Sequence, residues 1–126
     1  MNVLDSSCWI EFIHNTPIKS AFAPVVNRPR ELLVPTIVLY EVCKYLLPKT
    51  DEENVIKFVR FMQKGRVIVL TAELSTIAAN ISRKYKLAMA DSIIYATAQK
   101  YDAVLWTTDQ HFKGLPNVRY FDKTQR

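Results

Sequence analysis

The sequence predicts an α/β protein, a three-layer α/β/α sandwich around a central parallel sheet of about five strands. Its apolar runs are short and unbroken, as expected for strands that are covered on both faces of a sheet. Helix-like stretches with capping residues separate these runs, and strands that alternate with helices indicate parallel pairing. The 126 residues, 49% of them hydrophobic, show no repeat or linker, so we expect one domain over residues 1–126.

The first strand and the first helix are expected close to the N-terminus. Residues 2–4 form a short apolar run that ends at Asp5. Ser6 or Ser7 stands where it can cap a helix over residues 8–13. Because the strand-like run starts at the second residue, we expect no signal peptide.

The next stretch predicts a helix, a strand and a longer helix. Pro17 occupies a place that the start of a helix tolerates, and Pro24 then interrupts this helix. Residues 32–34 predict a buried strand. Thr36 is a good N-cap for a helix over residues 37–47, which a proline ends.

Two further helices are expected on either side of a third strand. Residues 50–53 have the pattern of a capping box, which opens a helix that ends near Gly65. Residues 67–70 predict the strand, and Thr71 caps a helix that reaches about Tyr85.

The last part of the chain carries its clearest helix-and-strand pattern. Residues 87–98 predict a helix whose alanines allow close packing on a sheet, and residues 103–106 predict a buried strand. Residues 117–121 predict a short final strand. The polar tail from about Asp122 is expected to fray.

Four acidic residues fall at informative places in this pattern. Asp5 ends the first strand, and Asp109 follows the strand over residues 103–106. Asp91 stands at the start of a helix, and Glu41 interrupts the apolar stripe of another helix, one turn above its start. In open parallel sheets, ligands bind in the crevice beyond the carboxyl ends of the strands. We therefore expect the four acids to meet there.

Each of these acids also has a purely structural interpretation. Asp91 fits an N-cap, Asp109 fits a turn residue, and Asp5 can cap the helix that follows it. Glu41 is the hardest of the four to explain by structure alone, although the exposed edge of its helix would accommodate it. The four positions together are much less easily accidental than any one of them.

Clustered carboxylates repel one another, and without a cation some of them must take up protons. A hard divalent cation such as Mg²⁺ removes this conflict, because it prefers oxygen ligands and commonly joins protein carboxylates to phosphates. Zinc fits less well, since no Cys/His ligand spacing occurs and His14 and His111 are far apart in the sequence.

The overall charge agrees with a polyanionic partner. Seventeen Lys and Arg residues against twelve Asp and Glu residues give a net charge of +5. Such a surface can hold a phosphate backbone around an acidic pocket, although many proteins are mildly basic. No apolar run is long enough to span a bilayer. Cys8 and Cys43 both have apolar neighbours, so we expect free thiols and a cytoplasmic location rather than a disulfide.

Four segments in order give the chain a family resemblance: residues 3–7, 34–41, 90–98 and 105–112. With these segments the chain resembles a PIN-domain ribonuclease, specifically the toxin of a VapBC-type toxin–antitoxin pair. The resemblance covers nearly the whole chain. It implies that the metal ligands are Asp5, Glu41, Asp91 and Asp109, and that Thr107 supplies an accessory hydroxyl.

Two positions near these acids match the family less closely. The small polar residue that the family has after its first acid corresponds to Ser6 or Ser7. The family often has a basic residue before its last acid, whereas this chain has Thr108 there.

The resemblance further implies a Mg²⁺- or Mn²⁺-dependent endoribonuclease that cleaves single-stranded regions of RNA. Asp5, Asp91 and Asp109 would hold the principal metal, and Glu41 would complete the site or support a second ion. A water activated by the metal would attack phosphorus in line. The resemblance also implies a homodimer and a small antitoxin protein that covers the acidic cleft, and we expect no membrane association.

The substrate must then be held by other residues. Arg83, Lys84 and Lys86 precede the Asp91 helix and are the better candidates, together with Ser7. A second basic group is Lys57, Arg60, Lys64 and Arg66, which fits a solvated helix face as well as an RNA track. Trp9 and Trp106 lie in apolar elements and are expected in the core rather than against bases.

Two other kinds of protein remain compatible with this pattern. A receiver-like phospho-acceptor domain is also a small parallel α/β sandwich, but it needs an acidic pair where Asp5 is followed by two serines. It also needs a lysine after the fifth strand, where Lys123 is a poor candidate. A non-catalytic PIN-like module that binds RNA or protein is the other alternative, and the retention of all four acids argues against it.

Overall fold

The computed structural model describes residues 1–125. Five strands form one sheet in the order β3-β2-β1-β4-β5, and every neighbouring pair is parallel. This confirms the predicted α/β sandwich. The strands are β1 (Asn2–Leu4), β2 (Leu32–Pro35), β3 (Arg66–Ile68), β4 (Val104–Thr107) and β5 (Val118–Tyr120).

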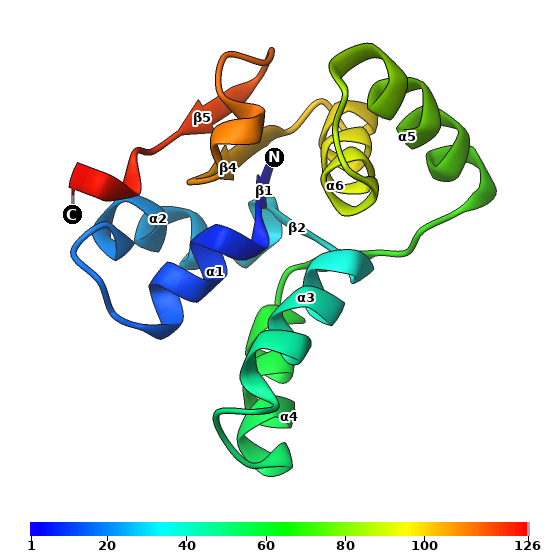
Figure 1. The fold of residues 1–126 in the computed structure, drawn as a ribbon. Helices are drawn as coiled ribbons and strands as arrows, with labels where there is room; N and C mark the ends of the chain where they lie inside the picture. Colours follow the sequence, from blue (N-terminus) through cyan, green and yellow to red (C-terminus); the bar gives the residue numbers. More distant parts are fainter. Residues whose placement is uncertain (126) are drawn as a thin grey trace.

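Six α-helices connect these strands in the described part of the chain. They are α1 (Ser6–Ile13), α2 (Lys19–Val26), α3 (Thr36–Leu46), α4 (Glu52–Met62), α5 (Ala72–Tyr85) and α6 (Met89–Lys100). Parallel crossovers are right-handed, so the crossovers from β1 to β2 and from β2 to β3 use one face, and the crossover from β3 to β4 uses the other. Figure 1 shows α1 and α2 across the sheet from α5 and α6.

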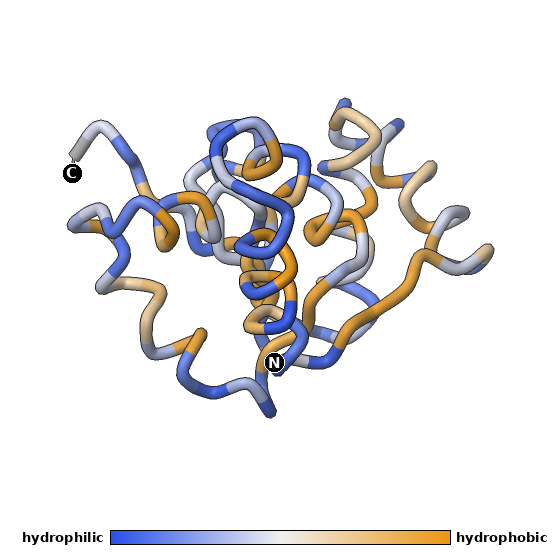
Figure 2. Tube along the Cα trace, turned by 90° about the horizontal axis from the view of Figure 1, so that it is seen from below, coloured by the Kyte–Doolittle hydropathy of each residue, from blue (hydrophilic) through white to orange (hydrophobic). Residues whose placement is uncertain are grey.

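The core lies between the sheet and its two helical layers. All four residues of β2 are buried, as are Val3 and Leu4 of β1, because helices cover both faces of the central strands. In Figure 2 hydrophobic and hydrophilic segments alternate along the chain. Among the described helices, none is both long and apolar enough to cross a bilayer.

The strand order reverses between β1 and β4, which makes this pair the topological switch point of the sheet. The chain runs from β1 toward β2 and β3 on one side, and β4 and β5 lie on the other. The pairing continues just past the strand end, where the Asp5 nitrogen donates to the Trp106 carbonyl at 2.9 Å. Side chains that follow β1 and β4 are therefore held next to one another.

Two helix starts differ from the sequence-based predictions. Helix α1 begins at Ser6, and its N-cap is Asp5, whose carboxylate accepts from the Ser6 nitrogen. Helix α3 begins at Thr36 itself, with Pro35 as an N-cap that offers no side-chain acceptor. In both helices the N-cap is the residue whose backbone is still extended. The sequence alone does not determine which residue that is.

Three other boundaries were also predicted wrongly. Helix α4 is capped by Asp51, which accepts from the Asn54 nitrogen, one residue later than the predicted box. Helix α2 continues through Pro24 to Val26, because a proline removes only one helical hydrogen bond. Strand β3 ends at Ile68, and the apolar pair that follows it, Val69 and Leu70, is 59% and 45% exposed. In the tail, Lys123–Gln125 form a 3₁₀ turn.

Trp9 joins the first helix to the α3–α4 hairpin. Its side chain is only 1% exposed, and its ring meets the rings of Phe12, Phe58 and Phe61 edge-on at centroid distances of 6.4, 6.1 and 6.3 Å. Asp5 is the N-cap of α1. This aromatic cluster therefore also holds in place the helix that Asp5 caps. This confirms that Trp9 is a core residue.

Replacing Trp9 with Ala is expected to lower the free energy of unfolding by about 3–5 kcal/mol, because it removes a fully buried aromatic side chain and leaves a cavity. Urea unfolding followed by circular dichroism measures this change. The matched control is Ile56→Ala on α4, whose side chain is 47% exposed and whose loss is expected to cost about 0.5 kcal/mol or less. Equal losses for both variants would contradict the role assigned to Trp9.

Candidate metal and active site

Two of the four predicted acids, Asp91 and Asp109, have ligand atoms within 4.8 Å of one another, whereas Asp5 and Glu41 lie outside this group and act on Asp91 through their charges. Asp5 follows β1 and Asp109 follows β4, so they lie on either side of the switch point. Asp91 is the third residue of α6, and Glu41 is the sixth residue of α3. Their charges act on one another, since the pKa of Asp91 is raised by Asp109, Asp5 and Glu41.

Asp5 is the most deeply buried of these acids and is only 3% exposed. Its Oδ1 accepts from the Ser6 nitrogen at 2.9 Å. Its Oδ2 accepts from the Ser7 and Thr107 hydroxyls, both at 2.8 Å. The carboxylate is therefore fixed in place by two hydroxyls that come from opposite ends of the chain.

Both hydroxyls are themselves oriented by the backbone. The Thr108 nitrogen donates to the Ser7 hydroxyl oxygen at 3.1 Å, and the Asp109 nitrogen donates to the Thr107 hydroxyl oxygen at 2.9 Å. Because each hydroxyl has a single proton and its oxygen already accepts, that proton is directed at Asp5. The network thus offers two donors to Asp5 and favours its ionised form.

Burial opposes this preference. The pKa of Asp5 is raised, mainly by burial and also by the charge of Asp109, while the Ser7 and Thr107 hydrogen bonds lower it. The pKa of Glu41 is raised mainly by burial and also by the charges of Asp5 and Asp109, while a hydrogen bond with Ser6 and the charge of Lys44 lower it. Burial and the three other acids raise the pKa of Asp91 to about 6. This is the conflict expected of carboxylates gathered without a counter-ion.

The tightest group within the cluster includes a residue that sequence reasoning missed. Ligand atoms of Asp91, Asp109 and His111 all lie within 4.8 Å of one another. The His111 Nδ1 is 3.0 Å from the Asp109 Oδ1 and 3.7 Å from the Asp91 Oδ2. His111 was considered only as a zinc partner for His14, whereas the 3₁₀ turn Gln110–Phe112 brings it back to the acids.

Glu41 provides a test of whether a cation fits this site. Its Oε1 is buried and has no hydrogen-bond partner among the described residues. A buried carboxylate oxygen without a partner is costly, and native structures rarely leave one unsatisfied. Three aspartates, this glutamate and a neighbouring imidazole form a donor set that a hard divalent cation would complete. The residues present therefore fit a Mg²⁺ or Mn²⁺ ion.

The predicted substrate-binding residues divide into two groups. The hydroxyl of Ser7 contacts Asp5, so its observed position is that of a support for the first acid. Arg83, Lys84 and Lys86 are exposed at the end of α5. The ion pair between Lys100 and Glu73 shows that α5 and α6 run antiparallel, which places these cations near the start of α6. None of them forms an ion pair with a described acid.

Thr108, which stands where the family often has a basic residue, is 2% exposed and interacts through its backbone nitrogen. Trp106 packs against Phe121 in a stacked arrangement, and its Nε1 donates to Asn2. Both tryptophans therefore belong to the packed interior and its margin, as predicted. Cys8 is buried, Cys43 is half-buried, and both are free thiols.

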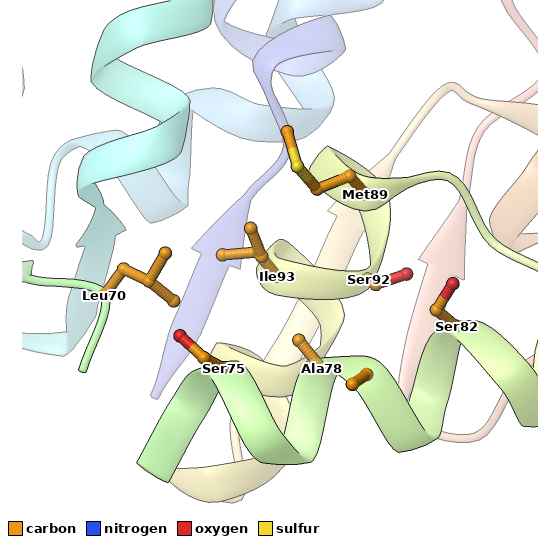
Figure 3. A pocket seen from close by; sticks show the side chains of 8 residues that line it. Leu70, Ser75, Ala78, Ser82, Met89, Ser92 and Ile93 are labelled. Carbon is orange, nitrogen blue, oxygen red and sulfur yellow. The ribbon is translucent and has the colours of Figure 1, made fainter. Parts of the chain in front are cut away.

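A separate hollow of about 380 Å³ lies between α5 and α6. Figure 3 shows its lining, in which Leu70, Met89 and Ile93 contribute apolar side chains and the polar groups are serine hydroxyls. It contains no ionisable group, so it offers no acid, base or metal ligand. The chemistry that the sequence predicts belongs to the acidic cluster and not to this hollow.

Comparison with protein families identifies the class of protein. The chain matches the family model of the PIN domain over residues 3–118. Because this match spans most of the chain, the protein belongs to the PIN-domain family, as the sequence resemblance predicted. A comparison with curated protein sequences finds no match.

Solved structures with the same fold include toxins from several bacteria. A toxin–antitoxin complex from Klebsiella pneumoniae aligns with a TM-score of 0.80 and 20% identity, over 94% of this chain and 96% of that chain. VapBC2 from Rickettsia felis, bound to a promoter DNA fragment, aligns with a TM-score of 0.75 and 19% identity, over 96% of this chain and 98% of that chain. VapC20 from Mycobacterium tuberculosis, which cleaves the sarcin–ricin loop, aligns with a TM-score of 0.72 and 19% identity, over 94% of this chain and 99% of that chain.

The strand order excludes the receiver-like alternative. Flavodoxin-like proteins of that kind have the order 2-1-3-4-5, whereas this sheet has the order β3-β2-β1-β4-β5. The phospho-acceptor hypothesis is therefore wrong for this chain.

The pKa of Asp91 predicts how the stability of the metal-free protein depends on pH. Its folded-state value of about 6 lies above the ordinary 3.8, so the folded state binds more protons between these values. Its contribution to the free energy of unfolding therefore falls as the pH rises from 3.8 to about 6, and it stays lower above that. In EDTA, we expect Asp91→Asn to leave the free energy of unfolding nearly unchanged at low pH. Above about pH 6 we expect it to raise the free energy of unfolding relative to the wild type.

Thermal melts at pH 4 and pH 7.5 measure this effect, with Asp102→Asn at an exposed loop position as the matched control. Added Mn²⁺ is expected to raise the melting temperature of the wild type at pH 7.5, by mass action on the folded state. Mn²⁺ should raise the melting temperature of Asp91→Asn much less. A stability difference between wild type and Asp91→Asn that is independent of pH would contradict the assignment.

Proposed function

We propose that this protein is a metal-dependent endoribonuclease and the toxin of a toxin–antitoxin pair. The observation that carries the proposal is the meeting of four carboxylates at the switch point, with the buried Glu41 Oε1 left without a partner. Membership of the PIN-domain family supports it. So does the similarity to VapC20, which is described as a toxin that cleaves the sarcin–ricin loop.

In this proposal, Asp5, Asp91, Asp109 and Glu41 hold the metal, which is Mg²⁺ or Mn²⁺. When bound, such an ion polarises the phosphodiester and lowers the pKa of a water. The pKa of Asp91 is raised first by burial and then by the neighbouring acids, and a nearby positive charge would lower it, so that all four acids could be ionised at neutral pH.

The remaining side chains position these acids. Thr107 and Ser7 aim two protons at Asp5 and so keep its carboxylate ionised and fixed. His111 contacts Asp109 through Nδ1 and restrains the carboxylate that follows β4. Arg83, Lys84 and Lys86 supply positive charge near the start of α6 for the phosphate backbone, and binding should weaken as salt increases.

The proposed partners are single-stranded RNA, a small antitoxin protein and a second copy of the chain. The similar structures from Klebsiella pneumoniae and Rickettsia felis are toxin–antitoxin complexes, which supports the antitoxin. For the homodimer, the supporting surface is the hollow between α5 and α6, where Met89 is 73% exposed. A cytoplasmic location follows from the RNA substrate and agrees with the two free thiols.

Metal-dependent cleavage is tested with purified protein and a labelled single-stranded RNA in Mn²⁺ or EDTA. Asp5→Ala and Asp91→Asn are each expected to lower the cleavage rate roughly 100-fold or more while the protein stays folded. The exposed Asp102→Asn serves as the matched carboxylate-to-amide control and should cleave like the wild type. Equal cleavage in EDTA would contradict the metal dependence. A folded wild type that binds RNA without cleaving it would identify a non-catalytic binding module.

Replacing Thr107 with Val tests the support of Asp5. The change leaves the Asp109 nitrogen without its acceptor and removes one of the two hydroxyls that donate to Asp5 Oδ2, while the Ser7 hydrogen bond remains. The loss is expected to cost about 1–3 kcal/mol of stability and to weaken Mn²⁺ binding. Thr107→Ser restores the hydroxyl and should recover both. Urea unfolding and Mn²⁺ titration measure the two effects. A valine variant that binds Mn²⁺ like the wild type would show that the hydroxyl does not position the ligand.

A further inference from the structure

Three neighbouring hollows form one groove beside the acidic cluster. The first, of about 460 Å³, is lined by Tyr40, Glu41, Lys44, Tyr45 and Lys49 among others, and it shares Ile10 and Tyr45 with the second. The second, of about 370 Å³, shares Ser7, Thr108 and Lys123 with the third. The third, of about 450 Å³, reaches Asp109 and His111. We name this continuous surface the α1–α3 groove.

The groove has an acid at each end and a lysine near each acid. Glu41 lies in the first hollow together with Lys44 and Lys49, and Asp109 lies in the third together with Lys123. The positive charge of Lys44 lowers the pKa of Glu41. Within residues 1–125, none of the three lysines forms an ion pair with a carboxylate. The Lys49 ammonium instead donates to the Tyr45 carbonyl at 3.3 Å. A third acid, Glu11, also lines the second hollow, but it is only 3% exposed. The charges of the three lysines can therefore still attract an anionic ligand that passes the acidic cluster.

Aromatic rings lie among these charges. Tyr40 is 58% exposed and directly precedes Glu41 on α3. The Lys49 ammonium lies 3.9 Å from the centre of the Tyr45 ring, and the hydroxyl of that tyrosine contacts His14. Exposed aromatic rings that stack bases, next to cations that hold phosphates, are the usual means of binding a single strand of nucleic acid.

We propose that the α1–α3 groove holds single-stranded RNA on both sides of the scissile phosphate. Lys44 and Lys49 contact phosphates on the Glu41 side, Lys123 contacts a phosphate on the Asp109 side, and Tyr40 stacks on a base. This inference rests on the proposed nuclease function. It adds Lys44, Lys49, Lys123 and Tyr40 to Arg83, Lys84 and Lys86, which the proposed function already assigns to the phosphate backbone.

The lining favours RNA over a peptide of a partner protein. A bound amphipathic helix uses a continuous apolar groove, whereas here lysines and acids stand among Ile10, Pro48 and the tyrosines. Lysines that are free of carboxylate partners match the regular negative charge of a phosphate backbone. A metal bound at the acids would remove the repulsion that they would otherwise exert on that backbone.

The charge contacts are tested by fluorescence anisotropy with a labelled single-stranded RNA in EDTA, so that binding is measured without cleavage. The groove variant is Lys44→Ala, Lys49→Ala and Lys123→Ala combined. The matched control is Lys57→Ala and Arg60→Ala on α4 combined with Lys64→Ala just after it, which removes the same charge from residues that do not line the groove. The slope of log affinity against log salt should fall in magnitude by about 2 for the groove variant and much less for the control.

The stacking contact is tested in the same assay by Tyr40→Ala, with Tyr40→Phe as the conservative variant. Loss of one base–aromatic stack should weaken binding roughly 5- to 100-fold, whereas the phenylalanine keeps the ring and should bind like the wild type. Tyr40 is largely exposed, so both variants are expected to fold, and thermal melts verify this.

The outcomes separate this inference from the proposed function. If the wild type binds and cleaves RNA but the groove variant keeps the affinity and salt slope of the control, the groove assignment is wrong and the nuclease proposal stands. If the groove variant keeps RNA binding and loses a co-purifying small protein, the groove serves that protein and the assignment is also wrong. If the wild type neither binds nor cleaves RNA, the nuclease proposal itself fails.

Discussion

Mutual repulsion among four carboxylates at the end of two neighbouring strands is the constraint on which the rest of this structure depends. Parallel pairing of β1 with β4 sets Asp5 beside the segment that carries Asp109, and the helices that cover the two faces bring in Glu41 and Asp91. Burial strengthens the repulsion because little water screens it. The pKa of Asp91 rises to about 6, chiefly because burial disfavours its charged form and further because the three other acids repel it. A fold that holds these carboxylates near one another favours the binding of a divalent cation.

The rigidity of the site comes from hydrogen bonds that join the start of the chain to its last quarter. Ser7 and Thr107 each receive a backbone N–H and direct a proton to Asp5, so the beginning of α1 and the end of β4 form one unit. The Trp9 cluster then ties α1 to α4. Tight packing therefore supports the acidic side of the site. The α1–α3 groove lies beside these acids, and its lysines and Tyr40 are exposed to an incoming substrate.

Much of the fold and of the acidic cluster could be predicted from sequence, because unbroken apolar runs and acids at element ends are local patterns. The exact helix starts could not, since the sequence offers Asp5, Ser6 and Ser7 alike as caps of α1, and the structure selects Asp5, whose backbone remains extended. His111 was missed because its proximity to Asp91 depends on a turn in three dimensions. The groove was missed for the same reason, since its lysines come from α3, from the turn after α3 and from the chain beyond β5, and the last of these is far from the others in the sequence.

The most direct test of the central claim is the anomalous scattering of Mn²⁺ in crystals of the wild-type protein grown at neutral pH. The account predicts one strong peak within bonding distance of oxygens from at least two of Asp5, Glu41, Asp91 and Asp109, at the carboxyl ends of β1 and β4. Saturating Mn²⁺ that leaves this position without a peak, or that binds only elsewhere on the surface, would contradict a shared metal site.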